Sequence, residues 1–360
     1  MPKIQLNLFP NMNLRDTIRT KSIKVSHWEY WPWQLVYVPI FIQYGWQSIK
    51  YGSFAYPTII NRPYMEFGGI VEESKWDMYL KSPKNNTPNT ALLPSLYEKE
   101  EWESFLEKHN LEFPLIVKPD LGMRGKGILK INGIEELMEF RPCSKYKFLI
   151  QEFLSYSNEI GLFIFKNPKS DQWQISSIME RKFPTIIGDG KNNIEQLIRK
   201  NSRTFLQLDR WKSQERFDFG KILREGEELK LDHIGNHRLG TKFMDVQFRN
   251  NEALLKSITK YCEQIEGLEY GRLDIVFNSW EELNQGENFS VIEINGANAE
   301  PSHIYDPKHS IFYAWSGLYF HFRMQYLIAK KARKKGRKAV SQAKAWSLLG
   351  GYKHTMKDLD

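Results

Sequence analysis

Cysteine is scarce in this chain. Cys143 and Cys262 are the only two among 360 residues, and they form neither a CxxC pair nor a dense cluster. A disulfide framework needs several closely spaced cysteines, so the spacing excludes one. Both thiols are expected to be buried or half-buried side chains of a protein in a reducing compartment.

Long hydrophobic runs are also missing. No stretch reaches the roughly 18 apolar residues that a membrane-spanning helix requires. The first ten residues lack a basic region followed by an apolar run and a small-residue cleavage site, which a secretory signal would show. We therefore expect a cytoplasmic protein, with membrane association left open by the two features described next.

The closest approach to an apolar run is Trp31–Trp46, "WPWQLVYVPIFIQYGW", which prolines, glutamines and a glycine interrupt. Its aromatic ends resemble the interfacial belt of membrane proteins. One interpretation is a buried strand and loop packed on the main body. The other is a surface that contacts a membrane or a protein partner.

A strong charge of one sign is absent from most of the chain. The formal net charge is +8, but much of the excess lies in Lys330–Lys338, and the remainder is nearly balanced. This distribution argues against a specific nucleic-acid partner. The basic tail is either a solvated helix end that complements the helix dipole or a second membrane or protein contact.

Helical and strand patterns alternate along the chain and then strands cluster, with no internal repeat. This order predicts a mixed α/β or α+β fold with a substantial antiparallel sheet. The chain exceeds the usual length of one domain, so several lobes are expected. We divide it into segments 1–90, 91–150, 151–310 and 311–360.

The first group of residues with chemical potential lies in Ile116–Ile128, "IVKPDLGMRGKGI". A predicted strand carries Lys118 and leads into a loop where glycines alternate with basic side chains. Glycines let backbone N–H groups approach an anion, and the basic groups add positive charge that a triphosphate would use. A tight turn with solvated charges would give the same pattern. The candidate phosphate-binding residues are Lys118, Gly122, Arg124, Gly125, Lys126 and Gly127.

A second group lies in Phe148–Phe163, "FLIQEFLSYSNEIGLF", where an apolar strand runs into a short loop. Adenine needs a flat apolar slot with polar groups on one edge, and ribose hydroxyls favour a carboxylate. Glu159 is alternatively a surface carboxylate. The candidate nucleotide contacts are Gln151, Glu152, Phe153, Leu154 and Glu159.

The third group is formed by two stretches that we expect to pair as antiparallel strands, Gly271–Phe277 and Phe289–Asn295. A turn over "NSWEELNQGEN" that pairs Asn278 with Phe289 sets Val276 opposite Val291. The same register sets Asp274 opposite Glu293 and Arg272 opposite Asn295. Because side chains alternate between faces, four polar side chains then share one face: Arg272, Asp274, Glu293 and Asn295. The other face then carries Leu273, Ile275, Phe277, Ile292 and Ile294.

Two carboxylates opposite each other repel unless something neutralises them. A divalent cation reverses that interaction, and carboxylate and amide oxygens suit Mg²⁺ bound together with nucleotide phosphates. Asp274, Glu293 and Asn295 are therefore candidate metal ligands. The alternative is a salt-bridged sheet face in which Arg272 pairs with a carboxylate.

Taken in order, these motifs resemble the ATP-grasp family of carboxylate–amine ligases, over roughly residues 94–307. The resemblance is carried by "VKP" with its glycine loop, "IQEFL" with the later glutamate, and "GRLDIVF" with "VIEING". The segment "ERKFPTIIGDGKNNIEQLI" is similar to the cyanophycin synthetase branch, and the general site pattern is similar to D-alanine:D-alanine ligase. The resemblance implies ATP between two α+β lobes, 91–150 and 151–310, which follow an atypical N-terminal segment. Independently of it, the pattern of Ile311–Lys335, aromatic first and basic last, predicts a long C-terminal helix with a basic tail.

The resemblance also implies roles for the residues. Lys118 and the glycine loop would hold the phosphates, with Arg181 reaching them from a hairpin. The strand end Gln151–Leu154 would hold adenine, and Glu159 the ribose. One or two Mg²⁺ or Mn²⁺ ions would bind at the candidate metal ligands, and Arg272 would stabilise the charge that develops during acyl transfer.

The implied reaction activates a carboxylate as an acyl phosphate, releases ADP and phosphate, and joins the acid to an amine or similar nucleophile. The chain departs from the amino-acid ligases after Asn295, where "GANAEP" replaces the usual small residue and Pro-Gly. Both substrates are small molecules, and their candidate contacts are Asn298, Glu300 and His303. The alternatives are a kinase-type phosphotransferase and a non-catalytic nucleotide-binding module at a membrane.

Overall fold

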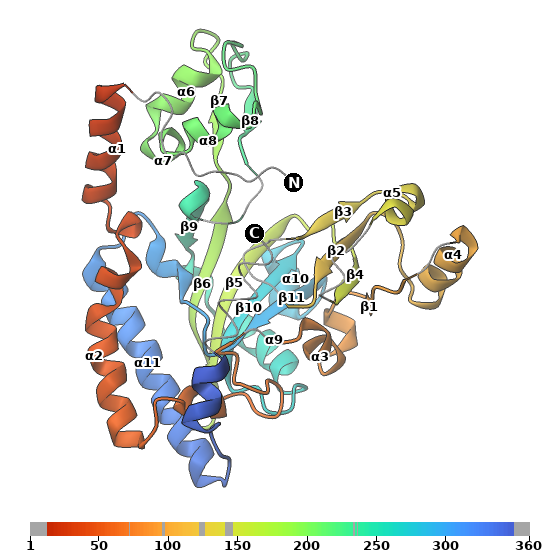
Figure 1. Ribbon diagram of the computed structural model, residues 1–360, viewed down its shortest axis with the longest axis vertical. Helices are drawn as coiled ribbons and strands as arrows, with labels where there is room; N and C mark the ends of the chain where they lie inside the picture. Colours follow the sequence, from red (N-terminus) through yellow and green to blue (C-terminus); the bar gives the residue numbers. More distant parts are fainter. Residues whose placement is uncertain are drawn as a thin grey trace. The chain divides into compact units, whose positions relative to one another are not determined.

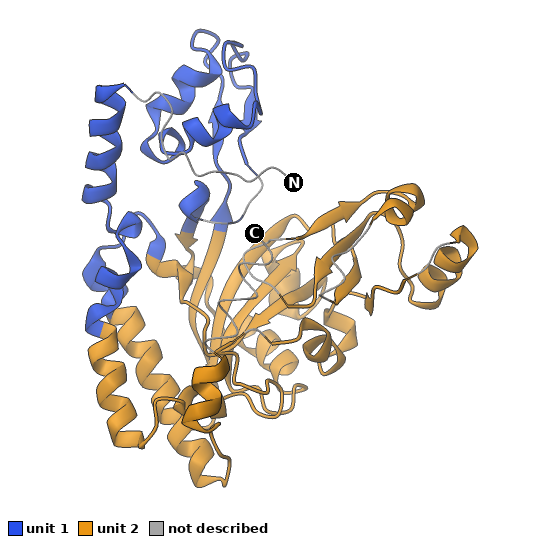
Figure 2. Ribbon diagram, viewed as in Figure 1, with its two compact units in different colours: residues 1–39, 181–243, 305–315 blue, residues 40–180, 244–304, 316–360 orange. Residues whose placement is uncertain are grey.

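The structure, a computed structural model, describes residues 13–71, 73–95, 98–121, 127–140, 147–232, 235 and 237–348 (Figure 1). By internal contacts the chain forms two compact units (Figure 2). One unit comprises residues 1–39, 181–243 and 305–315, and the larger one comprises residues 40–180, 244–304 and 316–360. The four segments expected from the sequence remain a prediction.

The larger unit contains a four-stranded antiparallel sheet in the order β1-β4-β2-β3. Its strands are β1 (Thr90–Leu92), β2 (Leu115–Pro119), β3 (Leu129–Ile131) and β4 (Phe148–Glu152). Helices α4 (Lys99–Lys108) and α5 (Ile134–Glu139) pack on it through the buried side chains of Trp102, Leu106 and Leu137. Helix α3 (Lys75–Leu80) precedes the sheet. This small sheet therefore has a hydrophobic core of its own.

A second, five-stranded sheet has the order β11-β10-β5-β6-β9. Its strands are β5 (Asn158–Lys166), β6 (Trp173–Lys182), β9 (Lys242–Asp245), β10 (Tyr270–Phe277) and β11 (Phe289–Asn295). Its apolar face packs on α9 (Glu252–Cys262) and α10 (Trp280–Gln285). Asn251 caps α9 by accepting a hydrogen bond from the Leu254 N–H, and Cys262 is buried in this core. Residues 153–157 carry the chain from the first sheet to the second (Figure 1).

The pairing expected between β10 and β11 is confirmed only at the end away from their connection, where the start of β10 pairs with the end of β11. Arg272 pairs with Asn295 and Asp274 with Glu293, as the alternation predicts. The register then shifts, so that Ile275 faces Val291 and Phe277 faces Phe289. The expected pairs Val276–Val291 and Asn278–Phe289 are wrong because β11 carries one extra residue, a β-bulge.

The bulge also changes which side chain enters the core. Val291 is buried with the apolar cluster, whereas Ile292, expected there, is only half-buried. The connection between the strands is not a plain turn either. It contains α10, which Ser279 caps and which ends at Gly286 with φ +82°.

The segment Trp31–Trp46 is not a strand, so that interpretation is wrong. It lies largely in helix α2 (Trp33–Tyr51), which buries Val36, Ile40, Gln47 and Tyr51 at helical spacing. The prolines and β-branched residues suggested a strand, but Pro39 is accommodated inside the helix at the cost of one N–H donor. The opposite face of α2 is exposed rather than buried.

The predicted C-terminal helix is confirmed as α11 (Ile311–Lys334). It lies beside α2 in the larger unit, because Gln43 donates a hydrogen bond to the Tyr319 carbonyl and Tyr44 contacts the ring of Phe322 (Figure 1). In the part of the chain that the structure describes, no helix is both long and apolar enough to cross a membrane. The cytoplasmic location remains a prediction.

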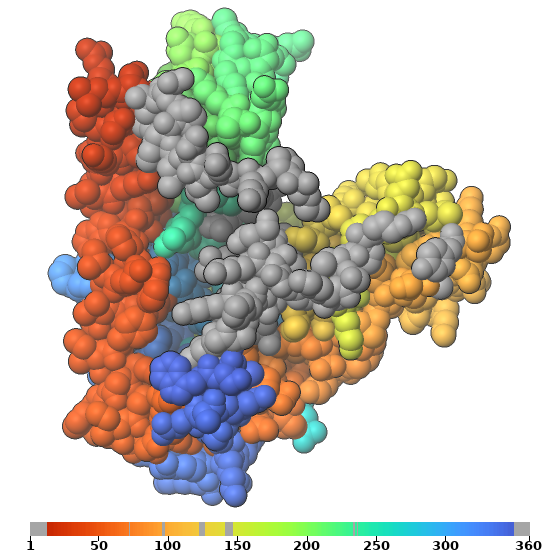
Figure 3. Space-filling view, in the orientation of Figure 1, coloured from red at the N-terminus to blue at the C-terminus, as the bar shows by residue number. Residues whose placement is uncertain are grey.

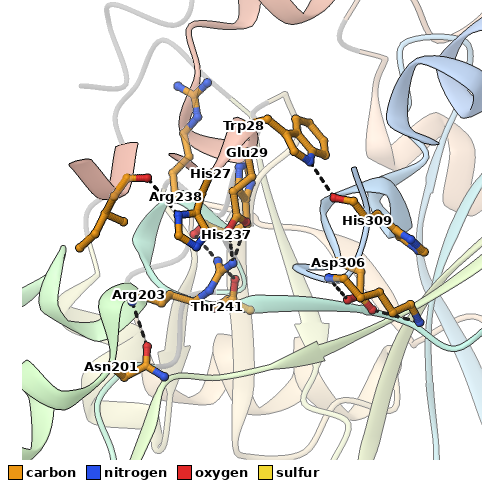
Figure 4. A network of polar contacts seen from close by, with 12 residues as sticks. His27, Trp28, Glu29, Asn201, Arg203, His237, Arg238, Thr241, Asp306 and His309 are labelled. Atoms are coloured by element: carbon orange, nitrogen blue, oxygen red, sulfur yellow. Dashed lines mark hydrogen bonds and ion pairs between the residues drawn. The ribbon is translucent and has the colours of Figure 1, made fainter. Parts of the chain in front are cut away.

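The smaller unit contains α1 (Leu14–Ser26), α6 (Ile194–Lys200), α7 (Ser202–Phe205), α8 (Leu208–Ser213) and the two-stranded sheet β7 (Thr185–Ile187) with β8 (Glu228–Lys230). Its core surrounds the fully buried Trp211. A buried ion pair joins Arg203 Nη2 to both carboxylate oxygens of Glu29 at 2.6 Å, and Arg203 also donates to the Thr241 carbonyl (Figure 4). The fixed donors of the guanidinium therefore tie three segments of this unit together.

Short 3₁₀ helices connect the longer elements. They are η1 (Trp28–Tyr30), η2 (Tyr56–Ile59), η3 (Lys84–Asn86), η4 (His237–Leu239), η5 (Gln247–Arg249) and η6 (Ser302–Tyr305). The observed mixture of helices and antiparallel sheets confirms the fold class expected from the sequence.

Candidate active site

One face of the five-stranded sheet carries the polar residues of the third sequence group. Asp274 on β10 lies directly opposite Glu293 on β11, and Arg272 lies opposite Asn295. The core side chains Leu273 and Ile294 alternate with them on the other face. The sheet therefore gathers two carboxylates, an amide and a guanidinium on one surface, as predicted.

Arg272 and Asp274 form a bidentate ion pair on this face. Arg272 Nε donates to Asp274 Oδ1 at 2.8 Å and Nη2 donates to Oδ2 at 3.2 Å, while Nη1 donates to Ser302 Oγ at 3.2 Å. Burial alone would lower the pKa of Arg272, but the nearby carboxylates, Asp274 first, outweigh it and raise that pKa. The salt-bridged alternative from the sequence is thus present in the structure.

Gly161 leaves the space that this ion pair occupies. It pairs with Asp274 across β5 and β10, and a Cβ there would lie 3.3 Å from Arg272 Cδ and 3.1 Å from Met179 Cε. Any larger residue would push the guanidinium away from its carboxylate. Glu159 lies two residues earlier on β5, opposite Val276, and therefore shares the face of Asp274.

Glu293 and Asn295 are available to a ligand to different degrees. The Glu293 side chain is 35% exposed, and its nearest cation is Lys75, with Nζ 4.0 Å from Oε1. Asn295 Nδ2 is buried and makes no hydrogen bond within the described residues. A rotation of this amide would turn an oxygen to the same position. Two carboxylates and an orphaned amide fit the oxygen ligands that Mg²⁺ uses.

Within the described residues we find no metal centre made of histidine, cysteine, aspartate and glutamate side chains alone. In the portion of the chain that is described, no group of three or more histidine, cysteine, aspartate or glutamate side chains could hold a metal ion. A site with two carboxylates and an amide would need further oxygen ligands, which nucleotide phosphates and water commonly provide to Mg²⁺.

Lys118 extends from the other sheet and is buried. Its Nζ donates to Tyr79 Oη at 2.7 Å and to Gln151 Oε1 at 2.9 Å. Burial lowers the pKa of this ammonium from 10.5 to about 8, against the opposing field of Glu293. With a pKa of about 8, Lys118 is still mostly protonated at neutral pH, although burial disfavours its charge. An anionic ligand would stabilise the charged form.

Helix α3 brings two further groups to the site that the sequence reasoning missed. Lys75 and Tyr79 are one turn apart and so share a face of the helix. Tyr79 accepts from Lys118 and donates to the Ile292 carbonyl at 2.5 Å, which connects the small sheet to the bulge of β11. Asp120 holds the helix start, because its Oδ1 accepts from the Trp76 N–H at 2.8 Å.

A small pocket opens beside Glu293 at this junction. Lys75 and Tyr79 of α3 line it together with Glu293 of β11. The remaining lining residues are Tyr64, Met78, Ser82, Tyr261, Val291 and Ile294. The pocket therefore joins one cation, one carboxylate and an apolar wall.

Most of the predicted glycine loop lies outside the described residues, namely Gly122, Arg124, Gly125 and Lys126. Gly127 is described and has φ +71°. It lies close to Pro119, the residue that follows Lys118, because a Cβ at Gly127 would be 3.3 Å from the proline ring. The phosphate-binding role of this loop stays a prediction.

The predicted adenine contacts lie where the chain leaves the small sheet. Gln151 is buried and its Nε2 donates to Thr90 Oγ1, whereas the Glu152 carboxylate accepts from the Asn89 N–H. The Phe153 ring is 39% exposed with Lys130 Nζ 4.1 Å above it, and Leu154 is half-buried. An exposed ring beside a strand end suits stacking with a flat ligand.

The predicted substrate residues follow β11. Asn298 is exposed and Glu300 is half-buried, whereas His303 is buried in the same unit beside Gly317. Arg181, expected at the phosphates, belongs to the smaller unit, where its side chain lies against Gly235. These residues are located, and their roles stay predictions.

The start of "GANAEP" is held by a close backbone crossing. Ala297 N–H donates to the Gly68 carbonyl at 2.9 Å and Asn298 N–H donates to the Gly69 carbonyl at 2.8 Å. A Cβ on Gly69 would lie 2.5 Å from Gly296 Cα, so only glycine fits. Gly68 and Gly69, outside the region of resemblance, therefore fix the loop next to the candidate metal ligands.

No protein-family model matches the sequence, and no curated protein is similar enough to count as a relative. Among solved structures, the chain resembles a bifunctional glutathione synthetase from Pasteurella multocida, with 12% identity over 65% of this chain and 34% of that chain, at a TM-score of 0.41. It thus spans about a third of that synthetase.

Two other similar structures are ligases as well. One is D-alanine–D-alanine ligase from Bacillus anthracis, with 16% identity over 72% of this chain and 70% of that chain, at a TM-score of 0.39. The other is the ATP-grasp ligase PsnB with minimal precursor, Mg and ADP, with 11% identity over 66% of this chain and 54% of that chain, at a TM-score of 0.31. Because these TM-scores are below 0.5, the function proposed below rests on the residues of this chain.

Proposed function

We propose that the protein is an ATP-dependent ligase that activates a carboxylate as an acyl phosphate and joins it to an amine or a similar nucleophile. The observation that carries this proposal is the meeting of two sheets. A buried lysine from one sheet, Lys118, lies within the electrostatic field of Glu293 on the other, and Glu293 lies opposite Asp274. Cations and paired carboxylates in one site suit a nucleoside triphosphate with a divalent ion.

The residues have separate tasks in this reaction. Lys118 and Lys75 balance the charge of the phosphates as the terminal phosphoryl group passes to the substrate carboxylate. Arg272 is fixed by Asp274 and Ser302, so its remaining charge can stabilise the oxygen that becomes negative during acyl transfer. Because the donors are already oriented, little reorganisation is needed at the transition state.

Asp274, Glu293 and Asn295 would hold the divalent ion, Mg²⁺ or Mn²⁺, whose positive charge neutralises the transferring phosphoryl group. Asp274 would then share its carboxylate between the ion and Arg272. The amide of Asn295, which has no hydrogen bond within the described chain, would supply the third oxygen.

Phosphorylation is required because a carboxylate is a poor electrophile. Its oxygen is a strongly basic leaving group, whereas phosphate is a much weaker base. Attack by the amine on the acyl phosphate breaks the carbon–oxygen bond and releases phosphate, and the amine loses a proton. The substrate contacts Asn298, Glu300 and His303 belong to the same proposal.

The test is incubation of the full chain with Mg·ATP and pooled carboxylates and amines, followed by mass spectrometry. We expect ADP, inorganic phosphate and a new amide in equal amounts. AMP with pyrophosphate would contradict acyl-phosphate chemistry, and ADP with a stable phosphorylated product would indicate a kinase-type phosphotransferase instead. The matched control is the Glu293→Gln variant, which should form neither ADP nor the amide.

A further inference from the structure

Helix α2 has two apolar faces, and among the residues that the structure describes only one of them is buried. The inner face is buried against the body, whereas the outer face exposes Phe41, Ile42, Trp46 and Ile49, with Ile42 71% and Ile49 75% exposed. Figure 3 shows the orange-red surface of α2 with no coloured segment lying over it in this view. A helix that is apolar all round normally has a partner on each face.

The neighbouring helix extends this surface. In the larger unit α11 exposes Tyr319 and Phe320, and Gln43 of α2 donates a hydrogen bond to the Tyr319 carbonyl. The two helices run in the same direction, because Arg333 near the end of α11 donates to the carbonyl of Tyr51 at the end of α2. Their carboxyl ends therefore meet at one end of the apolar surface.

That end is strongly basic. Neither α2 nor α11 contains an aspartate or glutamate, and residues 330–338 contain seven lysines and arginines with no acid. Arg333, Lys334, Lys335 and Lys338 are exposed. Lys50, in the last turn of α2, lies 4.7 Å from the ring centroid of exposed Trp46. Tryptophan beside lysine is the combination found where apolar and headgroup layers of a membrane meet.

We propose that this surface of α2 and α11, here called the α2–α11 face, binds an anionic lipid membrane. The exposed apolar side chains enter the boundary between headgroups and acyl chains, and the basic end pairs with anionic headgroups. The charge pattern favours this occupant over a second copy of the chain, since neither helix offers an acid to neutralise the basic residues of another. The protein would lie on the bilayer rather than cross it.

This placement has a structural link to the candidate active site. Gln325 of α11 is buried, and its Nε2 donates to the Ala297 carbonyl at 2.8 Å and to Tyr270 Oη at 3.2 Å. Ala297 belongs to the loop that follows the candidate metal ligands. The helix that would rest on the membrane is thus hydrogen-bonded to the substrate loop, although the membrane proposal stands whether or not the protein is a ligase.

The experiment is flotation of the full chain with vesicles of phosphatidylcholine, alone or mixed with phosphatidylglycerol. The wild type should float with the mixed vesicles and much less with phosphatidylcholine alone, and high salt should weaken its binding. Ile42→Glu combined with Ile49→Glu should reduce binding by at least about tenfold, because charged side chains replace the apolar ones that enter the lipid. Lys334→Ala with Lys335→Ala should reduce it by roughly fivefold or more.

The matched control is Phe248→Glu, which changes an apolar side chain with 78% exposure outside the α2–α11 face. It should bind vesicles like the wild type. A wild-type protein that does not float, or a doubly substituted Ile42 and Ile49 variant that floats equally well, would overturn the proposal. So would sedimentation equilibrium showing that the wild type self-associates through these two residues without binding vesicles, because the occupant would then be a second copy.

Discussion

Asp274 and Glu293 lie directly opposite each other on two neighbouring antiparallel strands. Like charges in this arrangement repel, and here Arg272 neutralises Asp274 while Lys75 approaches Glu293 only to 4.0 Å. The Glu293 side chain therefore stays 35% exposed, open to a further ligand.

Replacement of Glu293 by glutamine should separate function from stability. Glu293→Gln should lower Mg-dependent ATP turnover by at least about 100-fold, because a metal ligand is lost. Without metal its melting temperature should be no lower than that of the wild type, since one of two opposed charges is removed. Steady-state kinetics and thermal denaturation measure the two effects.

The control for this substitution is Glu287→Gln, an exposed carboxylate shortly before β11. It should keep wild-type turnover. Equal turnover in Glu293→Gln and the wild type would contradict the assignment of the metal ligands.

Lys118 should make ATP affinity depend on pH. Its pKa in the folded protein is about 8, so the ammonium that binds phosphate is lost as the pH rises through that value. The KM for ATP should therefore rise from neutral pH to about pH 9. Lys118→Arg keeps its charge throughout this range, and its KM should vary much less with pH.

The same lowered pKa predicts that folding stability increases with pH, whereas ATP affinity decreases. Between about pH 8 and 10.5 the unfolded chain holds the Lys118 proton more tightly than the folded one. Folding stability should therefore rise with pH across this window, by up to about 3 kcal/mol at 1.36 kcal/mol per pKa unit. Urea unfolding of the wild type and Lys118→Met measures it, and equal slopes in both proteins would exclude Lys118 as the source.

Lys75 should contribute to ATP binding. Lys75→Ala should raise the KM for ATP by roughly 10- to 100-fold, because a charged contact to phosphate is worth about 1.5–3 kcal/mol. Lys99→Ala is the control, since Lys99 is exposed and Glu103, one turn away, is its ion-pair partner on the helix surface. If both variants raise the KM equally, Lys75 has no special role.

Gly69→Ala should destabilise the protein by more than about 2 kcal/mol. The new Cβ would meet Gly296 Cα at 2.5 Å, and φ at this residue is +74°. Gly52→Ala also changes a residue with positive φ, +83°, but has no atom within 4 Å of the new Cβ. Gly52→Ala should therefore cost only about 1–2 kcal/mol in chemical denaturation, and equal losses would show that the crossing with Gly296 is not tight.

The polar face was predictable from sequence because strand alternation is regular over Arg272–Asp274 and Glu293–Asn295, which pair on one side of the bulge. The bulge was not, since Val291 and Ile292 are both β-branched and apolar, and either could fill the core. Helix α2 resembled a strand for a similar reason: with apolar residues on both faces, it shows no clear helical period. Its exposed side depends on packing that no local pattern encodes.

Lys75 and Tyr79 were missed because their importance depends on distant parts of the chain. The bond from Tyr79 to the Ile292 carbonyl spans 213 residues. The one local signal was the lysine and tyrosine spaced four apart after Ser74, which caps α3. Short helices with this spacing are common, so the sequence alone does not mark these residues as functional. Their role becomes visible only in the fold, where Tyr79 contacts the β-bulge at Ile292.

The most direct test of the central claim follows the carboxylate oxygen. The protein should be incubated with Mg·ATP, pooled amines and carboxylates labelled with ¹⁸O, and the released phosphate analysed by mass spectrometry. Attack of the carboxylate on the terminal phosphoryl group predicts phosphate that carries one ¹⁸O atom from the acid, in amounts equal to the amide formed. Amide formation with unlabelled phosphate, or with AMP and pyrophosphate, would contradict the proposed reaction.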